Sequence, residues 1–325
     1  MPVETHPPQR TFLPNDTAEL RNKTRSGRCR RCDRMRREGE HFRVCSGCQS
    51  ALYCGEECQK ADWPAHKAIC KFNQQTSQLM ASSPEGQQSV IDGLPNFIEL
   101  KAHLRDFTEV HKASLTGIFQ AKVVLQGGAE NIEPQVCIVP LKYRAPGPEG
   151  PNPALTFTCK SVALLPRARL LADAPTRHPQ LFQAWEASAS TRERIRAVYA
   201  NDPDFVDALP VLFQPQIGPT QMVYFPQYRS DGMLRSVYPT REAAQRQIDL
   251  YLKFIELGIV VQDKNARRGM EKPAPGYMKK MAGGKWVWTV LFDWETDPAW
   301  LRAKSMAERF RLLQQKLEAA QRSAA

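Results

Sequence analysis

Seven of the nine cysteines lie together with His66 within 42 residues, at spacings typical of metal ligands. The spacing is C-x2-C-x12-C-x2-C-x5-C-x3-C-x7-H-x3-C, and the candidate ligands are Cys29, Cys32, Cys45, Cys48, Cys54, Cys58, His66 and Cys70. Zinc accepts four sulfur or nitrogen ligands without geometric demands of its own, and a CxxC pair can reach one ion across a tight turn. Eight ligands therefore predict two zinc ions in closed tetrahedral sites, which leave no open position for catalysis.

Two kinds of local structure should position these ligands. The two CxxC pairs suit tight turns, whereas the last four ligands form two pairs with a four-residue step, which places each pair on one face of a helix. Pro64 would break a helix interior, but it suits the first turn of a new helix that carries His66 and Cys70. About forty residues cannot build a stable apolar core, so zinc should supply the folding free energy, on the order of 10 kcal/mol per ion.

This order of residues resembles a MYND-type zinc finger. The resemblance rests on the CxxC pairs, on Tyr53-Cys54-x3-Cys58-Gln59 and on Asp62-Trp63 before His66-x3-Cys70. It departs mildly in the x12 stretch, which is on the long side. RING and PHD fingers also cross-brace two zinc ions, but they place the histidine in the middle of the ligand order.

The spacing alone leaves open which ligands share an ion. The resemblance implies an interleaved, cross-braced assignment, in which one zinc is held by Cys29, Cys32, Cys54 and Cys58. The second zinc is then held by Cys45, Cys48, His66 and Cys70.

The resemblance also implies a partner, namely short proline-containing peptides of other proteins, often transcriptional co-regulators. Gln59 and Trp63 match the family positions that line a shallow peptide groove. Trp63 suits an anchor on physical grounds as well, because it is a large amphipathic side chain beside a rigid metal site. The alternative is that Trp63 packs in the small core between the two zinc ions, and the sequence does not decide between them.

Composition divides the chain into four regions. Residues 1–25 hold four prolines and few apolar residues, which predicts a mobile tail. The MYND-type finger occupies residues 26–72. Residues 73–93 are rich in Gln, Ser and Gly and are predicted to be a linker. The remaining residues, 94–325, are long enough to bury a core of their own.

Residues 94–325 alternate between helical and strand-like patterns. Apolar residues at three- and four-residue steps predict a helix from Leu94 to Ile118, stopped by Gly127-Gly128. Further helices are predicted at residues 179–199, at 240–257 with Thr240 as its cap, and at 298–321. Strands are predicted at residues 136–141, 154–165, around 211, 222–225 and 285–294. The fold class is therefore a small cross-braced two-zinc finger plus a larger α+β domain of unknown function. Cys137 and Cys159 lie in apolar surroundings and are predicted to be buried small hydrophobes.

The motifs favour a binding protein over an enzyme. The chain has no GxSxG, HExxH, P-loop or GxGxxG motif. MYND fingers also occur in SET-domain lysine methyltransferases that use S-adenosylmethionine, but those need a SET segment ahead of the finger and an Asn-His signature after it. Only 28 residues precede Cys29, and no Asn-His pair occurs. The chain is therefore predicted to be an adaptor and not an enzyme, with a SET-less or divergent protein lysine methyltransferase as the alternative.

The basic charge allows a third function. Between Lys23 and Arg37 there are eight basic residues and the single acid Asp33. The formal charge of +11 falls to about +8 once seven thiolates (−7) and two zinc ions (+4) are counted. The run could attract nucleic acid, but it also solvates the finger, and no base-reading helix is evident. Nucleic acid is therefore possible but not favoured.

Targeting signals are not evident in the sequence. There is no apolar signal region, and no apolar run approaches the ~18 residues of a membrane span. An intracellular protein without a membrane partner is predicted, in the nucleus or cytoplasm, with the nucleus favoured by the resemblance.

Overall fold

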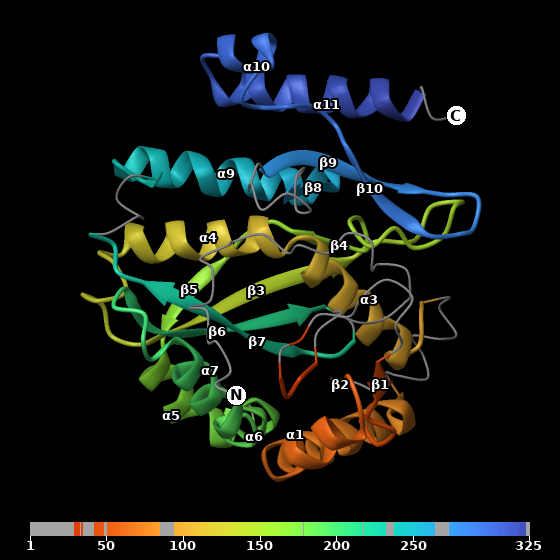
Figure 1. The fold of residues 1–325 in the computed structure, drawn as a ribbon, viewed down its shortest axis with the longest axis vertical. Coiled ribbons are helices and arrows are strands. Elements are labelled where there is room, and N and C mark those ends of the chain that lie inside the picture. The colour runs from red at the N-terminus through yellow and green to blue at the C-terminus, as the bar shows by residue number, and fades with distance from the viewer. Residues whose placement is uncertain are drawn as a thin grey trace, which may run out of the picture.

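The protein is described by a computed structural model that places residues 29–32, 34, 42–48, 51–84, 94–177, 179–216, 218–231, 237–263 and 273–322. The predicted tail and most of the basic run lie outside the described residues. Figure 1 shows a mixed sheet at the centre, helices on both of its faces, and the finger below it.

The finger consists of a short antiparallel hairpin and a long helix. The hairpin pairs β1 (Arg43–Val44) with β2 (Leu52–Tyr53), and the helix is α1 (Glu56–Ser82). The prediction that residues 73–93 form a linker is wrong for residues 73–82, because α1 continues through them. The Gln- and Ser-rich composition predicted a linker, but α1 packs against the helices α3 and α6 of the larger domain, and this packing stabilises the helix. Residues 85–93 lie outside the described residues.

The central sheet has the strand order β4-β3-β6-β7, and β5 also pairs with β3. Only β3 and β6 run parallel, and the other pairs are antiparallel. The strands are β3 (Gln135–Tyr143), β4 (Phe157–Cys159), β5 (Ala163–Pro166), β6 (Phe205–Pro215) and β7 (Gln221–Tyr228). The sequence predicted one strand at 154–165, which the structure divides into β4 and β5.

Helices cover both faces of this sheet (Figure 1). One face carries α4 (Lys112–Leu125), on which α9 (Arg241–Leu257) packs as a second layer. The other face carries three helices, α5 (Arg167–Arg177), α6 (Pro179–Ala187) and α7 (Ala189–Tyr199). The helix predicted at residues 179–199 is therefore two helices, which meet at Ser188, the N-cap position of α7.

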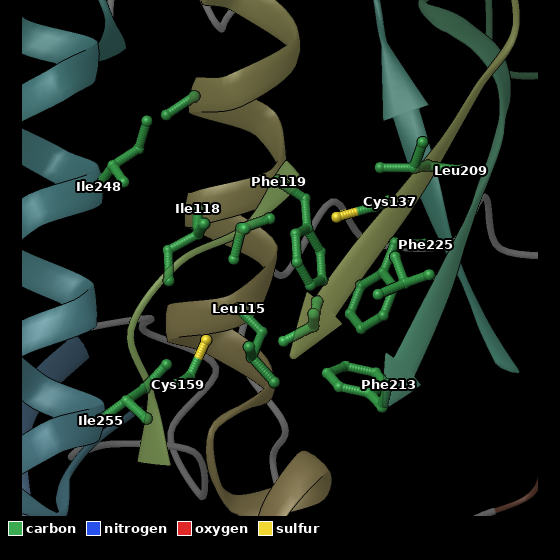
Figure 2. Packing of buried hydrophobic residues seen from close by; sticks show 14 of the residues in the cluster. Leu115, Ile118, Phe119, Cys137, Cys159, Leu209, Phe213, Phe225, Ile248 and Ile255 are labelled. Carbon is green, nitrogen blue, oxygen red and sulfur yellow. The ribbon is translucent and has the colours of Figure 1, made fainter. Parts of the chain in front are cut away.

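The main core lies between the sheet and the helices α4 and α9. Figure 2 shows Leu115, Ile118 and Phe119 of α4 between the strands and the α9 side chains Ile248 and Ile255. Cys137 and Cys159 are buried here, which confirms the prediction for both. Burial raises the pKa of Cys159 to about 12, so its thiol stays protonated and unreactive at neutral pH.

A second, three-stranded sheet follows α9. It has the order β10-β9-β8 and is antiparallel throughout. Its strands are β8 (Ile259–Asp263), β9 (Pro273–Lys280) and β10 (Trp286–Val290), and the chain then forms α10 (Pro298–Arg302) and α11 (Met306–Arg322). Phe254, Phe292 and Leu313 belong to the apolar cluster that joins this part to α9.

One predicted helix is broken by a buried histidine. The structure divides residues 94–118 into α3 (Phe97–Val110) and the start of α4, with His111 between them. The His111 ring is fully buried, and its Nε2 donates a hydrogen bond of 3.0 Å to the carbonyl oxygen of Ala154. This bond fixes the ring at the bend, so periodicity alone could not reveal the break.

His111 should make the larger domain sensitive to acid. Burial lowers its pKa to about 4, below the value of about 6.5 in an unfolded chain. Between these pH values the unfolded state binds more protons, so stability falls as the pH drops from about 6.5 to 4. In urea unfolding at pH 7 and pH 4.5, the native chain should lose about 2 to 3 kcal/mol more than His111→Gln, which keeps an amide donor for Ala154. Equal losses of unfolding free energy in the two proteins would contradict the assignment of this acid sensitivity to His111.

Candidate metal centre

Four cysteines from separate parts of the finger form the first ligand cluster. The sulfur atoms of Cys29, Cys32, Cys54 and Cys58 all lie within 4.8 Å of one another. Two of the pairs are measured individually, Cys32 to Cys54 at 3.7 Å and Cys54 to Cys58 at 3.4 Å. Four sulfurs at about 2.3 Å from one zinc would be roughly 3.8 Å apart in a tetrahedron. The cluster therefore has the size that zinc requires.

Three cysteines and His66 form the second cluster. The ligand atoms of Cys45, Cys48, His66 and Cys70 also lie within 4.8 Å of one another, and all four residues are buried. The Cys45 and Cys70 sulfurs are 3.7 Å apart, and Nε2 of His66 is 3.6 Å from the Cys48 sulfur. The two clusters alternate along the chain, so the finger is cross-braced and carries two structural zinc sites.

Backbone hydrogen bonds shape the turns that present the CxxC ligands. The amide of Cys29 donates to the carbonyl of Arg34 at 2.9 Å, and the amide of Cys45 donates to Ala51 across the hairpin at 2.9 Å. The amide of Arg30 donates to Leu52, which ties the first turn to β2. The two turns and the hairpin therefore form one unit around the metals.

The helix α1 carries three ligands, Cys58, His66 and Cys70. Cys54 lies just before the helix, so the predicted shared face holds for His66 and Cys70 but not for Cys54 and Cys58. The prediction that Pro64 starts a new helix is also wrong, because α1 is continuous through it. Pro64 lies on the exposed side, and so does Lys60, whose carbonyl loses its helical partner. Water can satisfy that carbonyl, which explains why the proline is tolerated.

The surroundings of His66 and Cys29 favour the protonation states that zinc needs. Burial and, to a smaller extent, the charge of Arg30 lower the pKa of His66 to about 4, so the ring is neutral at pH 7 with a lone pair available. Burial would raise the pKa of Cys29, but hydrogen bonds from the backbone amides of Cys32, Cys54 and Arg31 outweigh this and lower it to about 7. Amide donors of this kind favour the thiolate that zinc needs.

A buried carboxylate joins the finger to the larger domain. Asp62 is only 2% exposed, and it accepts hydrogen bonds from Nε of Arg30 at 2.8 Å and from the hydroxyl of Tyr53 at 2.7 Å. From α7, Arg194 donates to Asp62 at 3.4 Å and to the Arg30 carbonyl at 2.6 Å. Ser190 of α7 also donates to the carbonyl of Ala65 at 2.8 Å.

From the sequence, Asp62 was expected only as part of the family motif, and its partner Arg194 was not predicted. The Asp-Trp dipeptide was the available signal, but Arg194 lies 132 positions away from Asp62. The described members of the basic run also have structural roles. Arg30 pairs with Asp62, and the Arg34 guanidinium lies 5.0 Å from the centre of the Phe42 ring.

The structure places Trp63 outside the small core of the finger. Its side chain is 43% exposed, and its ring lies edge-on to His66 with centroids 6.0 Å apart. The core between the metals is formed instead by the ligands with Phe42, Leu52 and Tyr53. Gln59 is half-buried and lies one helical turn before Trp63, so the two share a face of α1.

Comparisons with known proteins identify the finger. The MYND finger family model matches residues 23–70. The chain is similar to the N-lysine methyltransferase SMYD2-A of Danio rerio, with 35% identity over 94 residues that cover 25% of this chain and 21% of that protein. It is 29% identical over 96 residues to the histone-lysine N-methyltransferase SMYD3 of Homo sapiens, which covers 26% of this chain and 22% of that protein. It is 44% identical over 48 residues to the Dauer abnormal formation protein 25 of Caenorhabditis elegans, which covers 15% of this chain and 12% of that protein.

The matches define one region and correct one prediction. Residues 23–70 are a MYND finger, a module of protein–protein interaction, and the chain spans about a fifth of the length of these methyltransferases. The prediction that the chain is not an enzyme is contradicted, because relatives with this finger are N-lysine methyltransferases. They favour the methyltransferase alternative over the adaptor. No solved structure matches the chain. Among the described helices, none is long and apolar enough to cross a membrane.

Proposed function

We propose that the chain captures a protein partner through its MYND finger, with Gln59 and Trp63 as the contact surface and a proline-containing segment as the ligand. The exposure of Trp63 carries this proposal. Tryptophan is highly buried on average in folded proteins, and it is enriched among the residues that dominate binding energy.

The surroundings of Trp63 support its role as an anchor. Asp62 precedes Trp63 in the helix, and the zinc ligands His66 and Cys70 follow it. These three buried residues fix the helix, so the Trp63 ring is held in place before binding. A preorganised contact loses little conformational entropy on association. Proline rings are rigid as well and pack against aromatic side chains. If the partner is a transcriptional co-regulator, the complex forms in the nucleus.

Replacing Trp63 with alanine should weaken peptide capture while two zinc ions remain bound. The loss should be about 2 kcal/mol, roughly thirtyfold in Kd, because the variant removes the proposed anchor. Calorimetric titration of proline-containing peptides into the zinc-loaded chain measures this loss, and native mass spectrometry counts the metal. Leu79→Ala is the matched control, because Leu79 is 63% exposed on the same helix but four turns further along. Equal affinity in Trp63→Ala and the native chain would refute the anchor.

A second candidate function is protein N-lysine methylation, in which the finger captures the protein substrate. The observation that favours it is the partial similarity to SMYD2-A and SMYD3. The test incubates the full chain with labelled S-adenosylmethionine and a lysine-containing protein array, and the expected result is label on lysine. If no label is transferred while peptide capture is intact, the finger's binding function stands without catalysis.

A further inference from the structure

A large cavity separates the finger from the sheet of the larger domain. It has a volume of about 940 Å³, is partly open to solvent, and is lined by residues of α1, of α3, of α5 to α7 and of the strands β3, β5, β6 and β7. Pockets for organic ligands are typically about 300 to 1,000 Å³. The cavity is therefore large enough for a small molecule and includes parts of both regions of the chain.

The walls of the cavity are mainly apolar and its charges have one sign. Apolar lining comes from all sides, including Phe72 of α1, Leu181 of α6, Leu212 of β6 and Met222 of β7. The charged residues among the described lining are Arg30, Lys101 and Arg105, and none of the lining residues is acidic. A ligand with an acidic group would complement this basic lining.

Lys101 is the cation of this group with the weakest compensation. Arg30 is paired with Asp62, and Nε of Arg105 lies 3.7 Å from the carboxylate of Asp106. Among the described residues, no carboxylate forms an ion pair with Lys101. Burial lowers its pKa, and the thiolates of Cys48 and Cys70 act in the opposite direction. Lys101 and Arg105 are one turn apart on α3, so both can face one anionic group.

We propose that this cavity binds an amphipathic anion, with its carboxylate or phosphate head group at Lys101 beside Arg105 and its apolar tail between α6 and the strands β6 and β7. The charge and the apolar walls are both needed for this choice. A free inorganic anion would leave the apolar walls unused, and a cationic ligand would meet basic side chains and no acidic one in the described lining.

The test titrates the zinc-loaded full chain with four probes and follows the heat of binding. Dodecanoate and dodecyl phosphate share one alkyl tail and differ in the head group, dodecanol has the tail without charge, and inorganic phosphate has the charge without the tail. The expected result is saturable binding of one anion per chain, tighter than dodecanol or inorganic phosphate. The tighter of the two anions identifies the head group.

Variants of Lys101 test the position of the head group. Lys101→Met keeps the aliphatic stem and should weaken the affinity for the preferred anion by roughly tenfold to a hundredfold. The affinity for dodecanol should not change. Lys101→Arg should retain binding, and Lys160→Met is the control for an exposed lysine elsewhere. The zinc content of each variant is counted in parallel, because Lys101 lies near the thiolates of the second site.

Four results would overturn the proposal. They are no saturable binding of either anion, equal affinity for dodecanol, no effect of Lys101→Met at a full zinc content, and displacement of the anion by S-adenosylmethionine. The last result would assign the cavity to a methyl donor and would support the methyltransferase candidate.

Discussion

Cys48→Ala is expected to reduce the zinc content of the chain from two ions to one or none and to unfold the finger. Cys48 is a buried ligand of the second cluster, and three protein ligands leave that zinc weakly held. Ligands make up half of the buried residues in the small core of the finger, so loss of the metal removes its folding free energy, on the order of 10 kcal/mol per site. Native mass spectrometry measures the zinc content, and hydrogen exchange of residues 42–70 measures the unfolding.

Cys159→Ala is the matched control for this variant. Cys159 is also a buried cysteine, but it packs in the main core and takes no part in either cluster. The Cys159→Ala variant should be destabilised by about 1 kcal/mol, which is typical of a small core deletion, and it should keep both zinc ions. Two zinc ions in Cys48→Ala would show that the ligand assignment is wrong.

The fate of the larger domain in Cys48→Ala shows how far the two regions depend on each other. The main core between α4, α9 and the sheet has no contribution from the finger, so it should remain folded. The helices α6 and α7 should lose protection, because α1 packs on them. Complete loss of far-ultraviolet dichroism would instead show that the chain folds as one unit.

Local patterns predicted the elements whose boundaries depend on nearby residues. The helix at residues 240–257 is the clearest case, because Thr240 accepts a hydrogen bond from the Ala243 amide and Gly258 ends the helix with a φ of 72°. Gly127 and Gly128 likewise adopt positive φ directly after α4. In each case a cap or a glycine determines the boundary, and both are visible in the sequence.

Features that depend on distant residues could not be predicted in this way. The break at His111 depends on the carbonyl of Ala154, and the helical state of residues 73–82 depends on helices that come later in the chain. The spacing of the metal ligands predicted two zinc sites, but their pairing came from the family resemblance alone. The cavity is lined by residues from stretches between Arg30 and Tyr224 that lie far apart in the sequence, and no sequence pattern records it.

Asp62→Ala is expected to destabilise the chain by about 3 to 5 kcal/mol, the range for removing one partner of a buried ion pair. The variant leaves Arg30, Tyr53 and Arg194 without their shared acceptor, and although Arg30 and Arg194 are partly exposed, the position of Asp62 itself is only 2% exposed. Asp62→Asn keeps an acceptor oxygen but loses the charge, so its loss should be smaller. Zinc content should stay at two, because Asp62 belongs to neither cluster. Urea unfolding gives the free energies.

Glu56→Ala is the control, and its comparison with Asp62→Ala decides what holds the finger in place. Glu56 is likewise an acidic residue of α1 with a basic partner. Its carboxylate lies 2.8 Å from Nζ of Lys60, but its side chain is 57% exposed. Exposed pairs contribute about 0 to 1 kcal/mol, so this variant should change little. If Asp62→Ala were no worse than Glu56→Ala, apolar packing of α1 alone would hold the finger. A large difference, together with faster hydrogen exchange in α7, would show that one buried carboxylate couples the zinc finger to the domain that follows it.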